Sequence, residues 1–279
     1  MEAWTERIAS LSLPHIVLGL VCLTAVRLVL RTGRTAVVRF LGELVEAVTL
    51  AAALVFLVLR PFVVHSYHIP TGSMRPTLRE GDHILVNKLA YRISPPRHGD
   101  AVVFRAPLEA DRGQREFIKR VVGLPGDRIE VLPGHVQVGN VVFGHPEILA
   151  VLGKGPSHEG AEGNLGPELH LTGDGIWIDG ILVTPAEFRT AVLAPPGTPV
   201  VIEPGLVLRN GEPILEDYVA EDPEYRVPEI KIPAGRCYVL GDNRNQSHDS
   251  HRWGLLDLQR VIGRADAVFW PPNRIHLLR

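Results

Sequence analysis

Cysteine and net charge are both scarce in this sequence. Only two cysteines occur among the 279 residues, Cys22 inside an apolar run and Cys237 in the C-terminal half. No C-x-x-C pair exists, which excludes the metal and redox motifs built on it, and a disulfide between these two residues is not expected. The formal net charge of −2 gives no indication of nucleic acid as a partner.

Other common site patterns are missing as well. The Gly-rich stretch from Gly153 to Gly166 lacks a G-K-[ST] ending, which excludes a phosphate-binding loop. Twelve histidines are scattered along the chain without an H-x-x-x-H pair, so no metal site is expected, and no cofactor is either. After Arg60 the sequence contains no convincing long amphipathic helix.

Two apolar runs lie near the N-terminus, from Leu11 to Leu30 and from Leu41 to Leu59. Each approaches the ~20 residues that a bilayer-spanning helix needs. Arginines are concentrated in and beside the segment between them, and cytoplasmic loops carry such an excess. We therefore predict a membrane anchor over residues 1–64, with helices at about 11–30 and 41–60 and a cytoplasmic loop at 31–40. Both ends of this anchor then lie outside.

Other interpretations of the apolar runs remain open. A single span at the second run is possible if the first run forms a buried or interfacial helix. A cleaved secretory signal fits poorly, because the chain begins with Glu2 and Glu6 where a basic region is expected.

Residues 65–279 are predicted to form an extracytoplasmic, mainly β domain with an antiparallel sheet. Short β-rich runs separated by Gly, Pro and Asp favour this class, and they cover 83–86, 101–104, 117–122, 128–131, 236–240 and 261–269. A smaller β-rich insertion is predicted at about 134–203. Units that begin at Gly134, Gly175 and, next to this region, Gly205 each resemble a strand entering a tight hairpin.

A serine and a lysine in this domain suggest a hydrolase whose base is an amine. A serine hydroxyl attacks only when a base removes its proton, and a neutral lysine can serve. Burial without a counterion lowers the lysine pKa from ~10.4 by several units. In a strand over 117–122, Phe117, Lys119 and Val121 share one face that carries no carboxylate. Alone, Ser73 would be read as a loop residue and Lys119 as a surface residue, so the combined pattern carries the hypothesis.

Four segments in a fixed order resemble the bacterial type I signal peptidases, or leader peptidases: Thr71 to Leu78, Gly81 to Lys88, Phe117 to Asp127 and Gly241 to Ser250. The resemblance covers about 62–127 and 206–270. It implies the fold shared by signal peptidases and repressor-type proteases. It also implies a multi-pass serine endopeptidase of the cytoplasmic (inner) membrane that cuts signal peptides from exported preproteins on the outer side. The implied partners are the lipid bilayer and preproteins with small residues at the first and third positions before the cut.

The resemblance assigns a role to each matching residue. Ser73 would be the nucleophile and Lys119 the general base, and Thr71 would form the oxyanion hole with the Ser73 backbone N–H. Ser247 would orient the lysine amine, and its surroundings would be built by Asp242, Asn243, Arg244, Asp249 and Ser250. The family box ends in Asp-Ser-Arg, whereas this chain has Asp249-Ser250-His251 followed by Arg252, so either residue is a candidate partner of Asp249.

Competing functions are weighed against this resemblance. The cluster His248-Asp249-x-His251 suggests a Ser–His–Asp triad with Ser73, or a metal site that lacks its third ligand. A different Ser/Lys self-cleaving protease of the repressor type would carry a DNA-binding domain instead of a double anchor. A non-catalytic, membrane-anchored β-scaffold would leave a labelled preprotein intact.

Overall fold

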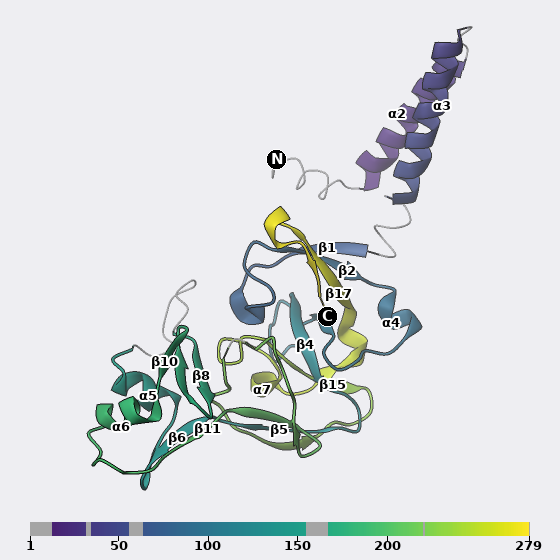
Figure 1. The fold of residues 1–279 in the computed structure, drawn as a ribbon. Coiled ribbons are helices and arrows are strands. Elements are labelled where there is room, and N and C mark those ends of the chain that lie inside the picture. The colour runs from purple at the N-terminus through teal and green to yellow at the C-terminus, as the bar shows by residue number, and fades with distance from the viewer. Residues whose placement is uncertain (1–12, 32–34, 56–63, 155–166, 220, 279) are drawn as a thin grey trace.

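The computed structural model describes residues 13–31, 35–55, 64–154, 167–219 and 221–278. Two helices, α2 (Leu13–Arg31) and α3 (Ala36–Ala53), precede a body made almost entirely of strands (Figure 1). Every strand pair in that body is antiparallel. The predicted mainly β, antiparallel class is therefore confirmed.

The two N-terminal helices differ in composition. Within the described part of the chain, only α2 is long and apolar enough to cross a membrane, over Pro14–Arg31. Helix α3 carries Arg39, Glu43 and Glu46 within its 18 residues. The second predicted span is therefore not confirmed, and its residues 56–60, like residues 11–12 of the first, lie outside the described residues.

The predicted loop at 31–40 is too long. Helix α3 begins at Ala36 because Thr35 caps it, with the Thr35 hydroxyl accepting a hydrogen bond from the Val38 N–H at 3.4 Å. Arg39 therefore lies inside a helix. The helices pack side by side (Figure 1), and Arg27 of α2 forms an ion pair with Glu46 of α3 at 2.6 Å.

The main sheet of the body holds the strands that carry the predicted site. Its order is β1-β2-β17-β3-β4-β15-β16, with β18 paired to β17. The bounds are β1 Val64–His68, β2 His83–Asn87, β3 Ala101–Arg105, β4 Glu116–Gly123, β15 Arg236–Leu240, β16 Leu256–Asp257, β17 Val261–Trp270 and β18 His276–Leu277. Short helices connect them: η2 Gly72–Met74, α4 Ala90–Ile93, α7 Ser250–Trp253, η3 Leu258–Arg260 and η4 Pro272–Arg274.

The strands of a four-stranded sheet flank the predicted insertion in the sequence, one before it and three after it. The order of this sheet is β13-β12-β5-β14, from β5 (Arg128–Leu132), β12 (Leu206–Arg209), β13 (Glu212–Pro213) and β14 (Val227–Lys231). The predicted hairpin after Gly205 is present, because β12 turns into β13 at Asn210, whose φ of 58° suits a tight turn.

Residues 134–203 form two three-stranded sheets. One has the order β11-β6-β7, from β6 (His135–Val138), β7 (Val141–Phe143) and β11 (Val200–Glu203), and the other has the order β10-β9-β8, from β8 (Leu169–Thr172), β9 (Gly175–Ile178) and β10 (Ile181–Val183). Both predicted hairpins in this range are present.

Two short helices accompany these sheets, α5 (His145–Val151) and α6 (Pro185–Ala191). Neither was expected from the sequence, since seven residues give only two turns of periodicity. A capping box between Thr184 and Glu187 begins α6. Strands and helices enclose one apolar cluster whose buried members all lie between 136 and 188.

Candidate active site

Ser73 lies in η2, directly after the strand that opens the body. Met74 and Leu78 are fully buried in the apolar core beneath this turn, so the segment is anchored on both sides of Arg75. The Asn243 backbone N–H donates to the Ser73 carbonyl at 3.2 Å. The nucleophile candidate therefore has a fixed backbone, and the loop after β15 holds it.

Lys119 lies on β4 and its side chain reaches Ser73. The Nζ donates to Ser73 Oγ at 2.6 Å and to the Ile118 carbonyl at 2.9 Å. Lys119 is only 4% exposed, and the Phe117 ring centroid lies 5.8 Å from its amine. Two segments 46 residues apart in the sequence are thereby brought into direct contact.

Burial is the main influence on the Lys119 amine. It lowers the pKa of Lys119 from 10.5 to about 8, while the carboxylates of Asp249 and Asp242 act in the opposite direction. Each of these carboxylates has a closer partner, Arg120 for Asp242 and His251 for Asp249. The amine thus loses its proton far more readily than an ordinary lysine does.

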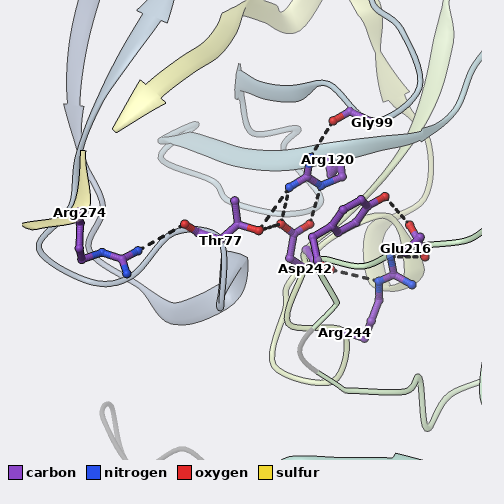
Figure 2. A network of polar contacts seen from close by, with 9 residues as sticks. Thr77, Gly99, Arg120, Glu216, Asp242, Arg244 and Arg274 are labelled. Carbon is purple, nitrogen blue, oxygen red and sulfur yellow. Dashed lines mark hydrogen bonds and ion pairs between the residues drawn. The ribbon is translucent and has the colours of Figure 1, made fainter. Parts of the chain in front are cut away.

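Asp242 forms a buried ion pair with Arg120 (Figure 2). The Arg120 guanidinium donates to both carboxylate oxygens, at 2.8 and 2.6 Å, and the two side chains are 2% and 0% exposed. Thr77 Oγ1 donates to the same carboxylate at 2.6 Å, which ties the segment after Ser73 to the loop after β15. Arg120 also donates to the Gly99 carbonyl at 2.8 Å and lies 3.8 Å from the Tyr218 ring centroid.

Sequence reasoning missed Arg120 and Thr77. Arg120 lies next to Lys119 on β4, so its side chain is directed to the opposite face of the strand, and no role was assigned to it from the sequence. The available signal was an arginine inside an otherwise apolar strand, because a buried guanidinium needs a carboxylate.

Arg244 and Asn243 hold the loop from within. Arg244 forms an ion pair with Glu216 at 2.6 Å and donates to the Gly241 carbonyl at 3.2 Å (Figure 2). Asn243 Nδ2 lies 3.4 Å from the Gly72 carbonyl. Both predicted residues therefore contact backbone that leads to Ser73 or Ser247.

The side chain of His251, and not that of Arg252, contacts the Asp249 carboxylate; Arg252 reaches Asp249 only through its backbone N–H, which donates to the Asp249 carbonyl at 2.9 Å. Asp249 Oδ1 lies 2.7 Å from His251 Nδ1, whereas Arg252 is exposed. Asp249 Oδ2 accepts the Gly241 N–H at 2.8 Å, and Ser250 Oγ accepts the Val239 N–H at 3.0 Å.

No group of three metal-binding side chains occurs among the residues that the structure describes. No hydrogen bond joins Ser73 to a histidine in the same described ranges, so the alternative triad is not assembled.

Ser247 does not make its expected hydrogen bond to Lys119. Its Oγ is buried without a partner in the described chain, because the amine donates to Ser73 and Ile118 instead. Ser247 nevertheless adjoins the site through Gly241. A Cβ built on Gly241 would lie 2.3 Å from both Ser247 Oγ and the Ser73 carbonyl, so only glycine fits there.

Thr71 lies at the edge of the site. It precedes η2, is exposed, and forms no side-chain capping bond to that turn. Its hydroxyl is therefore not engaged in holding the turn.

The sequence of this chain is similar to those of several known proteins. A model of the family described as signal peptidase, peptidase S26, matches residues 41–160 and 189–270, more than half of the chain. A probable signal peptidase I-1 of Synechocystis is 31% identical over 241 residues, which cover 85% of this chain and 86% of the relative. The signal peptidases I of Leptolyngbya laminosa and Aquifex aeolicus are 32% and 31% identical, covering 78% and 82% of this chain and 74% and 83% of their own lengths.

A solved signal peptidase I from Enterococcus faecalis aligns with 61% of this chain and 95% of its own, at 17% identity. The TM-score of 0.23 is too low to establish a common fold by itself. The sequence matches define a hydrolase of the serine endopeptidase class that processes signal peptides. The chain belongs to the type I signal peptidase family.

Proposed function

We propose that Ser73 and Lys119 are the catalytic dyad of a membrane-bound signal peptidase. The observation that carries this proposal is the 2.6 Å contact between Lys119 Nζ and Ser73 Oγ, at a lysine that is 4% exposed. No carboxylate is hydrogen-bonded to the amine within the described residues. A general base must lie within hydrogen-bond reach of the proton it removes, and this pair meets that condition.

The chemistry begins with a neutral Lys119 that accepts the Ser73 hydroxyl proton. Ser73 Oγ then attacks the carbonyl carbon before the cleaved bond, and the Ser73 N–H and the Thr71 hydroxyl stabilise the oxyanion. One such donor contributes about 3 kcal/mol to transition-state stabilisation. Lys119 returns the proton to the leaving amine, which leaves an acyl-enzyme on Ser73. Water, deprotonated by Lys119, hydrolyses this ester and regenerates the serine.

The buried ion pairs have an electrostatic role in this mechanism. Arg120 and His251 partner the carboxylates of Asp242 and Asp249, which would otherwise favour a charged Lys119. Their positions support a site in which the amine is desolvated but not neutralised by a direct counterion. Ser247 would orient the amine once a substrate alters the contacts of Ser73.

The anchor and domain arrangement form the second part of the proposal. Residues 1–64 would hold two spanning helices, with the Arg27–Glu46 pair allowing both charges to enter the bilayer together. Residues 65–279 would lie on the extracytoplasmic side, with 134–203 as an inserted subdomain. The substrate would be a preprotein with small residues at the first and third positions before the cut, because shallow pockets exclude larger side chains.

A cleavage assay tests the dyad. The full-length chain in detergent micelles is incubated with a labelled preprotein, beside Ser73→Ala and Lys119→Ala. Both variants should lose cleavage while keeping the wild-type circular dichroism spectrum. Ser94→Ala and Lys154→Ala are matched controls outside the site, and both should cleave normally. Near-normal turnover by either dyad variant would refute the proposal, and an intact preprotein with the wild-type chain would favour a scaffold.

A further inference from the structure

The two ends of the predicted insertion meet beneath one short segment. The Gly134 N–H donates to the Pro223 carbonyl at 3.2 Å. A Cβ built on Gly205 would lie 2.8 Å from that same carbonyl oxygen and 3.0 Å from the Gly134 nitrogen. Pro223 therefore covers the neck of the insertion, by which we mean Gly134, where the chain enters it, and Gly205, just after the chain leaves it.

Asp222 attaches this segment to the insertion itself. Its N–H donates to the Leu169 carbonyl at 3.3 Å, and its Oδ2 accepts the N–H groups of Leu171 at 2.9 Å and Gly205 at 3.3 Å. His170 Nδ1 lies 3.7 Å from Oδ1. These contacts fix Asp222 to strand β8, on which Leu169 and Leu171 belong to the insertion's apolar core.

The same segment is held from the other side by the loop after β15. Asn245 is 4% exposed; its Nδ2 donates to the Asp222 carbonyl at 2.8 Å and its Oδ1 accepts the Glu224 N–H at 2.8 Å. The side chain thus binds two backbone groups as a neighbouring strand would. One residue further, the Tyr225 ring stacks on His251, with centroids 3.9 Å apart and planes 13° apart.

We propose that Asn245 is a positioning residue that fixes the loop 241–251 against the neck of the insertion. This inference rests on the proposed dyad. The loop carries Ser247, Asp242 and Asp249 beside Lys119, and outside α7 it forms no helix or strand, so side-chain bonds to other segments hold it. Asn245 supplies such bonds to the backbones of Asp222 and Glu224, and His251 adds a ring stack on Tyr225. The position of the insertion is thereby transmitted to the surroundings of the catalytic amine.

Replacement of Asn245 tests this role in the full-length chain in detergent micelles. Asn245→Ala removes both hydrogen bonds of this buried side chain and should lower kcat on the order of tenfold. KM for a labelled preprotein should change less than twofold. The acidic limb of the pH profile, where kcat/KM falls as the pH is lowered, should move along the pH axis, because Asp249 and Asp242 shift relative to Lys119. Asn245→Asp keeps the acceptor for Glu224 and should give an intermediate loss. Gln137→Ala, which removes an amide bonded to the Gly139 carbonyl inside the insertion, is the control and should match wild type.

A second substitution distinguishes coupling from local damage. Asp222→Ala leaves the carbonyl that Asn245 binds but removes the carboxylate that binds β8. It should shift the same acidic limb, and the double variant should lose no more than the larger single loss, since both act through one connection. The inference would be overturned if Asn245→Ala kept the wild-type kcat and the wild-type acidic limb of the pH profile. It would also be overturned if the only change were a lower unfolding midpoint. Should Asn245→Ala not fold, the same readouts on Asn245→Asp decide. Failure of the dyad would instead appear as turnover by Ser73→Ala.

Discussion

The body that carries the proposed dyad and the insertion differ in the side chains that they bury. The insertion's core cluster has nine buried apolar members, and His145 is the one polar or charged side chain that is buried in the described part of residues 134–203. The body buries Lys119, Arg120, Asp242, Arg244 and Asp249 within or beside its sheets. Burying charge costs free energy unless each group is paired and hydrogen-bonded, whereas apolar burial stabilises directly. The buried Lys119 amine therefore lowers the stability of the body, whereas the interior of the insertion is stabilised mainly by apolar burial.

Ion pairs and hydrogen bonds reduce the free-energy cost of burying charge in the body. Asp242 and Asp249 each accept hydrogen bonds from at least two donors, and Arg120 and Arg244 each have a carboxylate within 2.6 Å. Lys119 is the exception, since its contacts are a hydroxyl and a carbonyl. Lys119 is therefore a buried charge that no hydrogen-bonded carboxylate compensates among the described residues.

Breaking the Asp242–Arg120 pair should have the largest effect on stability. Asp242→Ala leaves a guanidinium that is 2% exposed without its carboxylate, which should cost about 3–5 kcal/mol of unfolding free energy. Denaturant unfolding in detergent measures this loss. The control is Glu229→Ala, which removes an exposed partner of Arg128 and should cost under about 1 kcal/mol. Equal losses would show that burial does not distinguish the two pairs.

Removing the uncompensated charge should stabilise the body. Lys119→Met replaces the buried amine with an apolar chain of similar length. At pH 7 the folded lysine holds its proton at a cost that corresponds to the fall in pKa from 10.5 to about 8, or about 3 kcal/mol. The wild-type chain should therefore be less stable than Lys119→Met by up to that amount, although the proposed dyad predicts that the variant has no activity.

The pH dependence of the stability difference between the wild type and Lys119→Met provides a sharper test. Between pH 8 and pH 10.5 the unfolded lysine binds a proton that the folded one has released, so wild-type stability rises with pH. The advantage of Lys119→Met should be greatest below pH 8 and vanish above pH 10.5. An advantage that is constant across this window would mean that packing, not desolvation, is responsible.

Activity should follow the same titration. Below a pKa of about 8, the neutral fraction of Lys119 falls tenfold per pH unit, so kcat/KM should fall with a slope of one. Cleavage rates from pH 6 to 9 at fixed ionic strength measure this limb. An acidic limb centred near pH 6 would instead indicate that a histidine is the base.

The sequence predicts the body well because its strands alternate and end at turn residues. The runs at 83–86, 101–104, 117–122 and 261–269 all became strands within a few residues of their predicted bounds. The insertion was predicted less completely, since α5 and α6 are too short for a periodic signal. The predicted start of the second helix, at about residue 41, was too late because Thr35 was not recognised as the cap that begins α3 at Ala36.

The site, like the fold, was predicted from the sequence only in part. The contact of Ser73 with Lys119 follows from motifs, but the depth of burial that lowers the lysine pKa depends on long-range packing. Arg120 was overlooked because period-2 alternation assigns faces but does not report that both faces of β4 are covered. The choice of His251 over Arg252 required the geometry of α7, where Asp249 caps the helix and lies beside the His251 ring.

A small change in the insertion gives the mildest test of the comparison. Ile176→Val removes one methylene from a fully buried position in the apolar cluster and should cost about 0.5–1.5 kcal/mol. Because the loss is spread over an apolar core with its own sheets, kcat and the acidic limb should stay at wild-type values. A shift of that limb would mean that even core packing of the insertion reaches Lys119. The connection through Asp222 and Asn245 would then transmit strain as well as position.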